Sequence, residues 1–314
     1  MIIEKYKFSI CIPTYDRAAK LNELLINIRK NISDKNNFQI VISDNASPFE
    51  TARVVDSHQT YLNIKYIRND RNIGMSRNII ASVDYADGEY CILTGDDDIF
   101  RDGWFNVLEA LVQAHRPDLI VSNRLVCDAD MNIKFKEECG PIVGSPTSFR
   151  IESRTDLINY LNSTDSTSGF GYLSNLVVRR KSWTSSKASN FVNDHAFPHM
   201  IKIIDYLYTE GGVILRVPFE TVLARSGTDR LEEFTGSKKM SEFDKIMIHF
   251  DGFLSAAKYV APTDLEMSRA IINPIIKIFS KEYQNYYLNF AMSVDQEERG
   301  RYFLNQLLNL ATRL

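Results

Sequence analysis

The stretch Cys91-Ile-Leu-Thr-Gly-Asp-Asp-Asp-Ile-Phe100 decides the fold, because an apolar run typical of a buried strand ends at three consecutive carboxylates. Adjacent aspartates repel one another, and in an open α/β sheet ligands bind at the carboxyl ends of the strands. The combination predicts a bound cation. Oxygen ligands without nearby histidine or cysteine favour Mg²⁺ or Mn²⁺ bridging to a phosphorylated substrate. The alternative is a solvated acidic turn in which Asp102 caps a helix beginning at Gly103.

The residues before this stretch repeat a pattern of strand, polar turn and helix. Apolar strand-like runs lie at 8–15, 38–45, 64–68 and 90–98. Helical patterns of about a dozen residues separate them, for example at 17–30 and 75–86. Such alternation predicts an α/β fold with a mostly parallel, doubly wound central sheet flanked by helices. Its ligand crevice is expected where the strands end.

The second half of the chain is expected to extend this sheet and then to become helical. Strands are predicted at 119–126, 131–138, 172–179, 212–218 and 221–225, with a polar loop at 163–171. From residue 238 the apolar spacing is helical. We therefore predict a catalytic domain over 1–235, divided at 127, and a helical region over 236–314. Its aromatic segment 271–290 is core, a homodimer surface or a peripheral membrane contact.

Composition narrows the class of protein. With 314 residues, 44% hydrophobic and 25% charged, the chain can form a substantial core. A net charge of −3 gives no basic surface for nucleic acid. The four cysteines are few for this length and predict reduced core residues in a cytoplasmic protein. No stretch approaches the ~20 apolar residues of a membrane span.

Four polar turns together resemble the successive motifs of family 2 glycosyltransferases, whose fold is the Rossmann-like, nucleotide-sugar-binding GT-A fold. The turns are Pro13-Thr-Tyr-Asp-Arg17, Ser43-Asp-Asn-Ala-Ser47, Asn72-Ile-Gly74 with Arg77-Asn78, and Gly95-Asp-Asp-Asp98. Their order and spacing carry the resemblance. In detail they are similar to bacterial surface-polysaccharide transferases, including abequosyltransferase-like members.

The resemblance implies roles for individual residues. Donor-binding residues would be Pro13, Thr14, Tyr15, Arg17, Asp44, Asn72, Gly74, Arg77, Asp96, Arg225 and Arg230. Asp97 and Asp98 would bind Mn²⁺ or Mg²⁺, although Gly95 stands where the family usually has an aspartate, which leaves the metal ligand open. Other interpretations stay open: Asp44 as a turn residue, and the arginines as solvated side chains.

The catalytic base is sought about a hundred residues beyond the metal motif, where family members often carry Glu-Asp at a helix start. This sequence has Asn193-Asp194 there, so Asp194 is the first candidate, followed by His195 and His199. A carboxylate or imidazole would take the proton from the acceptor hydroxyl in an inverting transfer. Alternatively, Asp194 caps the helical run at 200–208.

These expectations define a metal-dependent glycosyltransferase. It would move a sugar from a nucleoside-diphosphate sugar to a hydroxyl of a glycan or lipid-linked glycan. The reaction would serve bacterial surface polysaccharide (O-antigen or capsule) biosynthesis, in the cytoplasm or at the inner face of the cytoplasmic membrane. One rival is a nucleotidyltransferase, but the turn at 13–17 has no glycine to cradle a phosphate. The other rival is a non-catalytic nucleotide- or carbohydrate-binding module.

Overall fold

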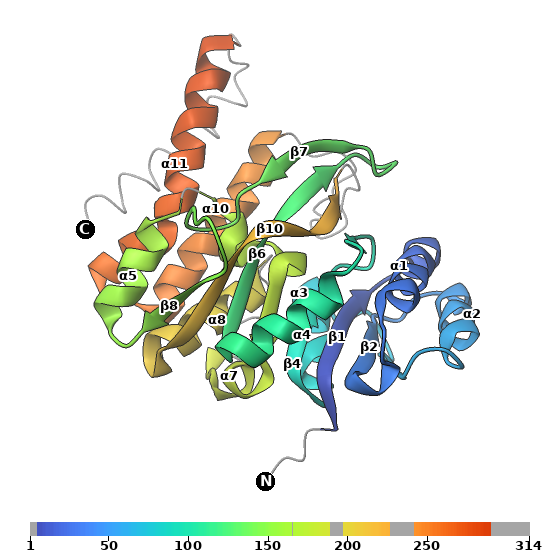
Figure 1. Ribbon diagram of the computed structural model, residues 1–314. Coiled ribbons are helices and arrows are strands. Elements are labelled where there is room, and N and C mark those ends of the chain that lie inside the picture. The colour runs from blue at the N-terminus through green and yellow to red at the C-terminus, as the bar shows by residue number, and fades with distance from the viewer. Residues whose placement is uncertain (1–4, 165, 189–196, 227–241, 290–314) are drawn as a thin grey trace.

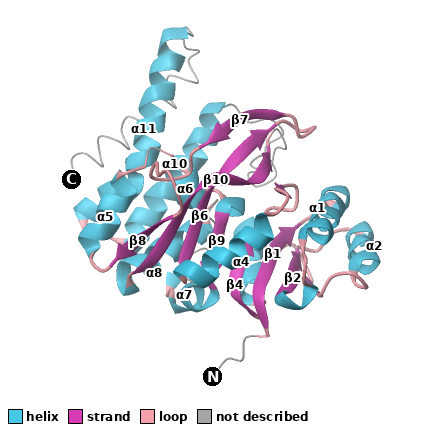
Figure 2. Ribbon diagram, in the orientation of Figure 1, coloured by secondary structure: helices cyan, strands magenta, loops and turns pink. Residues whose placement is uncertain are grey.

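A computed structural model describes residues 5–164, 166–188, 197–226 and 242–289, with the backbone alone at 242–247 and 279–289. One mixed sheet runs through the molecule and helices cover both of its faces (Figure 1 and Figure 2). The strands are β1 Tyr6–Thr14, β2 Phe38–Asp44, β3 Ile64–Arg68, β4 Gly88–Leu93, β5 Ile99–Phe100, β6 Leu119–Cys127, β7 Ile133–Glu137, β8 Thr147–Ile151, β9 Leu176–Arg179 and β10 Gly212–Arg225. The helices are α1 Ala18–Asn31, α2 Phe49–His58, α3 Met75–Asp84, α4 Trp104–His115, α5 Arg154–Asn162, α6 Ser168–Gly171, α7 Arg180–Ser185, α8 Pro198–Glu210, α10 Glu242–Val260 and α11 Leu265–Asn289.

The strand order confirms the predicted α/β fold. It is β3-β2-β1-β4-β9-β6-β10-β5, with β7 paired to β6 and β8 paired to β10. The first four strands are mutually parallel, as are β6 and β10, whereas β9 runs antiparallel to both of its neighbours. The carboxyl ends of β1, β2, β3 and β4 therefore lie along one edge of the sheet, where the polar turns follow them.

Alternation along the strands builds a core on each face of the sheet. In β1, Phe8, Ile10 and Ile12 pack toward α1, α2 and α4, whereas Cys11 points to the opposite face. That opposite face is covered by α3, α5, α8, α10 and α11, which share one apolar cluster with it. The C-terminal helices thus complete the core of the sheet, and all four cysteines are buried and free.

Two expectations about strands were wrong in detail. The sequence suggested a break at Pro218, but β10 is continuous from Gly212 to Arg225. Its register against β6 shifts between Val217 and Val222, and such a bulge accommodates a proline that cannot donate to the ladder. The predicted strand 172–179 begins only at Leu176, because residues 168–175 form α6 and a turn of 3₁₀ helix.

The start of α4 settles the alternative interpretation of Asp102. The N-cap of α4 is Gly103 without a side-chain cap, and Asp102 instead accepts a hydrogen bond from Lys30 at 2.9 Å. Helix α8 begins at Pro198, with Phe197 in the N-cap position. Asp102 is therefore not the cap of α4, whereas Asp194, the other candidate cap, lies outside the described residues. Among the described helices, none has an apolar stretch that could cross a membrane.

Candidate active site

The three aspartates after β4 are buried, and each is held by a different part of the chain. Asp96, Asp97 and Asp98 are 3%, 3% and 2% exposed. The Oδ2 atom of Asp96 accepts from the Thr14 hydroxyl at 2.8 Å, at the end of β1. Asp97 Oδ2 accepts from Nη1 of Arg17 at 2.9 Å, in the loop before α1. The first and last of the resembled motifs thus meet at one edge of the sheet.

Asp98 accepts hydrogen bonds from donors in the second half of the molecule. Its Oδ2 accepts from the hydroxyls of Tyr172, at 2.7 Å, and Ser174, and its Oδ1 accepts from the backbone N–H of Arg225 at 3.0 Å. Burial and the neighbouring Asp98 raise the pKa of Tyr172, so the phenol remains a donor at neutral pH. Asp98 is therefore placed to fix the turn, which leaves Asp97 as the better candidate ligand.

The guanidinium of Arg225 also supports this turn. Its Nε donates to the main-chain oxygen of Asp97 at 3.0 Å, Nη1 donates to the carbonyl of Ala129, and Nη2 pairs with Glu23 at 2.5 Å. The side chain is 3% exposed. Each guanidinium nitrogen therefore has an acceptor within the protein. In this structure Arg225 supports the aspartate turn, and its side chain does not face a place for the diphosphate as the resemblance implied.

The turn after β2 is organised by Asp44, which is fully buried. Its Oδ1 accepts from the N–H of Ser47 at 2.8 Å, which is the turn-forming bond that the alternative interpretation expected. Its Oδ2 accepts from the Tyr66 phenol at 2.5 Å, and Arg68 Nε lies 3.8 Å away. The Asp44 carboxylate therefore holds the loop at 45–47 in place.

Asparagines join the second and third turns. Asn45 donates to Asn72 at 2.7 Å and accepts from the N–H of Ile73 at 2.8 Å. Asn78 is 3% exposed and donates to the carbonyls of Thr14 and Ser43, which end the neighbouring strands β1 and β2. Asn78 belongs to the third motif, but the resemblance assigns it no role. An amide on the face of the helix that buries Ile79 and Val83 is the signal that points to it, because a buried amide needs hydrogen-bond partners.

The side chains that face solvent complete the site. Tyr15 is 43% exposed, Asn72, Gly74 and Arg77 are exposed, and Pro13 is half-buried. Gly74 has φ +87°, a conformation that favours glycine, and it lets the chain turn into α3. These residues lie in the turns after β1 and β3, at the sheet edge where the aspartate turn also lies, and we call them the polar rim.

Of the candidate bases, the structure describes His199 alone, because Asp194, His195 and the donor candidate Arg230 lie outside the described residues. His199 is 2% exposed, and its Nε2 lies 3.2 Å from the carbonyl of Gly171, to which it donates. Burial lowers its pKa to about 4. An enclosed imidazole of such low basicity is poorly suited to take a proton from an acceptor.

The oxygen donors of the aspartate turn fit a hard divalent cation in kind. They do not form a complete protein cage: among the residues that the structure describes, no cluster of three or more His, Cys, Asp or Glu side chains is arranged to hold a metal. A site with one or two carboxylates suits an ion whose remaining ligands come from a diphosphate and water.

The family assignment follows from the motif order and this geometry together with a family match. The model of glycosyl transferase family 2 matches residues 9–182, which include all four turns. This chain belongs to glycosyl transferase family 2. It is therefore a glycosyltransferase, and the recognition made from its turns is confirmed.

This glycosyltransferase is similar over most of its length to proteins of known name and to solved structures. It is 27% identical to the abequosyltransferase RfbV of Salmonella typhimurium over 272 residues, which span 86% of this chain and 80% of that protein. The solved structure of S. aureus TarS 1–349 in complex with UDP matches with a TM-score of 0.64 at 15% identity, covering 93% of this chain and 77% of that one. The mannosyltransferase PcManGT from Pyrobaculum calidifontis, in complex with GDP-Man and Mn²⁺, matches with a TM-score of 0.52 at 11% identity, covering 98% and 82%. Both structures confirm the fold.

Proposed function

We propose that this glycosyltransferase moves a sugar from a nucleoside-diphosphate sugar to a hydroxyl of a glycan or lipid-linked glycan during assembly of a bacterial surface polysaccharide. The observation that carries the proposal is the meeting of three buried aspartates with Thr14 and Arg17 at the end of β1, where the Asp16 N–H also joins this turn to Ser47 after β2. The relatives support it, since RfbV is named an abequosyltransferase and TarS a poly(ribitol-phosphate) β-N-acetylglucosaminyltransferase. Four buried free cysteines support a cytoplasmic location.

The donor would lie along the polar rim. The exposed Tyr15 and Arg77 would contact the base and ribose, and Arg17, which pairs with Asp97, would contact the diphosphate. Asp97, with support from Asp96, would hold Mn²⁺ or Mg²⁺, which supplies Lewis-acid stabilisation of the leaving diphosphate. Arg17 already pairs with Asp97, so it is positioned to contribute a second positive charge.

In the transfer, the acceptor oxygen bonds to the anomeric carbon while the bond from that carbon to the diphosphate oxygen breaks. The nucleoside diphosphate leaves with the electron pair, and the proton of the acceptor hydroxyl passes to a base. We propose Asp194 as this base and inversion as the outcome, because a carboxylate in that region suits the role and His199 is enclosed. Asp194→Asn should then abolish transfer while donor binding persists. Near-normal turnover would reject Asp194.

A screen of nucleotide sugars tests the function. CDP-, UDP-, GDP- and dTDP-linked sugars are compared for thermal stabilisation of the chain and for slow hydrolysis, with Mn²⁺ or Mg²⁺ and with EDTA. We expect one nucleotide to stabilise the protein, with hydrolysis that EDTA removes. Hydrolysis at full rate in EDTA would remove the metal from the mechanism, and a protein that binds donor without hydrolysis or transfer would be a binding module. The peripheral membrane contact and the homodimer at 271–290 stay predictions.

A further inference from the structure

A chain of side-chain contacts leads from the aspartate turn into the second half of the molecule. It begins at Asp98, whose Oδ2 accepts from the phenol of Tyr172 at 2.7 Å. The guanidinium carbon of Arg124, on β6, lies 3.6 Å from the centroid of the Tyr172 ring. A cation over an aromatic face is attracted by the ring quadrupole, more strongly where water is excluded. Tyr172 is thus held on its ring and on its hydroxyl at once.

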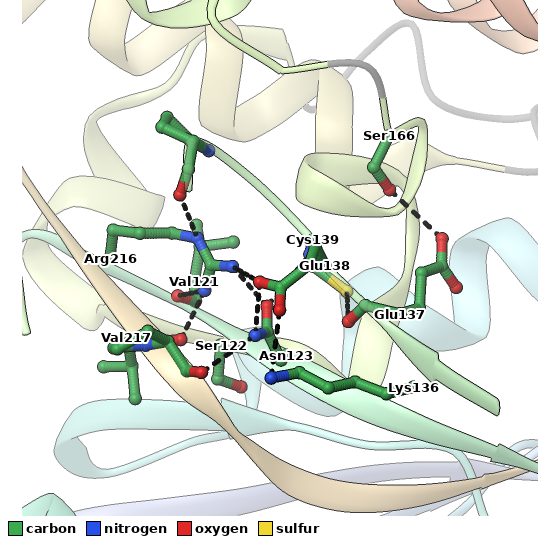
Figure 3. A network of polar contacts seen from close by, with 12 residues as sticks. Val121, Ser122, Asn123, Lys136, Glu137, Glu138, Cys139, Ser166, Arg216 and Val217 are labelled. Carbon is green, nitrogen blue, oxygen red and sulfur yellow. Dashed lines mark hydrogen bonds and ion pairs between the residues drawn. The ribbon is translucent and has the colours of Figure 1, made fainter. Parts of the chain in front are cut away.

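The same contacts continue from Arg124 to the polar turn at 166–168. Arg124 forms an ion pair with Glu137, at the end of β7, with Nη2 to Oε2 at 2.6 Å. The other oxygen of Glu137 accepts from the hydroxyls of Ser166, at 3.1 Å, and Ser168, at 2.6 Å. Figure 3 shows Ser166 directed at the Glu137 carboxylate. Four segments that are distant in sequence therefore meet in one continuous line.

The protonation state of Glu137 determines which role this chain of contacts can have. Burial alone would raise its pKa, but Arg124 and the two serine hydroxyls hold the pKa below its usual range. Glu137 is therefore ionised at neutral pH and is a weak base, so it is unsuited to take a proton from an acceptor. The contacts of Glu137 favour a role in positioning. The Glu137 carboxylate orients the Arg124 guanidinium, which in turn orients the ring of Tyr172.

We propose that Tyr172, Arg124 and Glu137 are positioning residues that couple the turn at 166–168 to Asp98, and through Asp98 to the site for the metal and diphosphate. The inference rests on the proposed function of the aspartate turn as the site for the metal and the diphosphate, whichever of its carboxylates is the ligand. Asp98 is adjacent to Asp97 and is held by Tyr172, Ser174 and Arg225, so the loss of one donor lets the whole turn shift. Groups that act through one network are expected to be non-additive when they are removed together.

A double-mutant cycle tests the coupling. Tyr172→Phe removes the hydroxyl and keeps the ring, and Glu137→Gln removes the charge and keeps the shape. The readout is the Mn²⁺ concentration that half-saturates binding of whichever of UDP, CDP, GDP or dTDP stabilises the chain most. We expect each variant to raise it about tenfold, as the loss of a hydrogen bond to a charged group does. In the double variant, the fold increase in this Mn²⁺ concentration should be clearly smaller than the product of the two single increases. Independent effects would overturn the coupling, and unchanged half-saturation would overturn the positioning role.

Matched variants separate this from general destabilisation and from failure of the proposed function. Tyr208→Phe removes another phenol that donates to an aspartate, Asp264, at 3.1 Å, and it should lower the melting temperature without changing half-saturation. Asp97→Asn should abolish the Mn²⁺ dependence. If it does so while Tyr172→Phe matches the unmodified protein, the inference fails and the proposed function stands. If only Tyr172→Phe has an effect, the assignment of Asp97 as the metal ligand fails and the positioning role stands.

Ser168→Ala tests the far end of the chain of contacts. It is a smaller change and should raise the Mn²⁺ concentration at half-saturation about threefold. No change would overturn the link to the 166–168 turn.

Discussion

Two clusters of buried charge lie in this sheet, and they differ in what they require. At the aspartate turn, three neighbouring carboxylates share one sheet edge, and Arg17, whose side chain is 13% exposed, reaches in from a loop. In the second half, Arg216 on β10 is 0% exposed. It donates to the carbonyls of Pro141, Val121 and Val217, to Asn123 and to Glu138 (Figure 3).

The difference separates a functional charge from a structural one. Adjacent like charges raise each other's energy, so a cation arriving at the aspartate turn is stabilised there. Arg216 is already enclosed by acceptors, and a further ion would find no place beside it. We infer that a local excess of one sign at an open edge identifies the site of chemistry, whereas a charge matched by acceptors in the interior identifies a structural clamp.

The largest expected effect is on activity, at the aspartate turn. Asp97→Asn keeps the shape of the side chain and removes the charge, so turnover should fall by about a thousandfold or more through lost Lewis-acid stabilisation. The melting temperature should change little. Initial rates at saturating donor, with thermal unfolding of the same preparation, check both. A variant with normal turnover would show that the charge excess at this edge has no catalytic purpose.

The opposite pattern is expected at the structural clamp. Arg216→Met should lower the free energy of unfolding by about 3 kcal/mol, because it leaves buried acceptors without their donor. Turnover per folded molecule should be retained. Arg101→Met is the matched control, since Arg101 pairs with Glu220 at the surface with a side chain 47% exposed, and its removal should cost about 0.5 kcal/mol. Urea unfolding measures all three proteins. Equal losses from the two variants would contradict the distinction.

Local sequence signals located the aspartate turn but not its supports. The strands β1 to β4 and the carboxylates after β4 follow from apolar runs and the residues that end them. Tyr172 and Arg225 reach Asp98 from 74 and 127 residues away, and no local pattern reports such pairings. The resemblance predicts Arg225 at the diphosphate, and the burial of its guanidinium cannot be read from a single arginine at the end of an apolar run. Asn78 differs, because its place on the buried face of a helical pattern predicts that its amide must find partners in the protein.

A smaller effect is expected from pH, at His199. Its folded pKa of about 4 lies below the ordinary value of 6.5, so the unfolded state binds the proton more readily. Its contribution to stability is complete above pH 6.5 and is lost as the pH falls through 6.5 toward 4. Between pH 6.5 and pH 5 this amounts to about 2 kcal/mol. His199→Gln should flatten the pH dependence of urea unfolding in that window and leave the pH profile of turnover unchanged. If the pH profile of turnover instead loses a transition in the imidazole range in His199→Gln, His199 is again a candidate for the catalytic base.

The smallest effect is expected at Asp44, a buried carboxylate at the site that is nonetheless matched by donors. By the distinction drawn above, it acts on the nucleotide through the turn that it holds. Asp44→Ala removes the acceptor for the N–H of Ser47, so we expect nucleoside-diphosphate affinity to fall about tenfold, the equivalent of one hydrogen bond.

Asp44→Asn provides the decisive comparison at this position. The asparagine keeps an oxygen for Ser47, and the phenol of Tyr66 can accept from its amide where it formerly donated to Asp44. Affinity measured by calorimetry should therefore stay within about threefold of the unmodified protein. Equal weakening by Asn and Ala would mean that the charge itself touches the nucleotide. In that case a carboxylate fully bonded to the protein would still serve the ligand, and hydrogen-bond satisfaction alone would not separate structural from functional charges at this edge of the sheet.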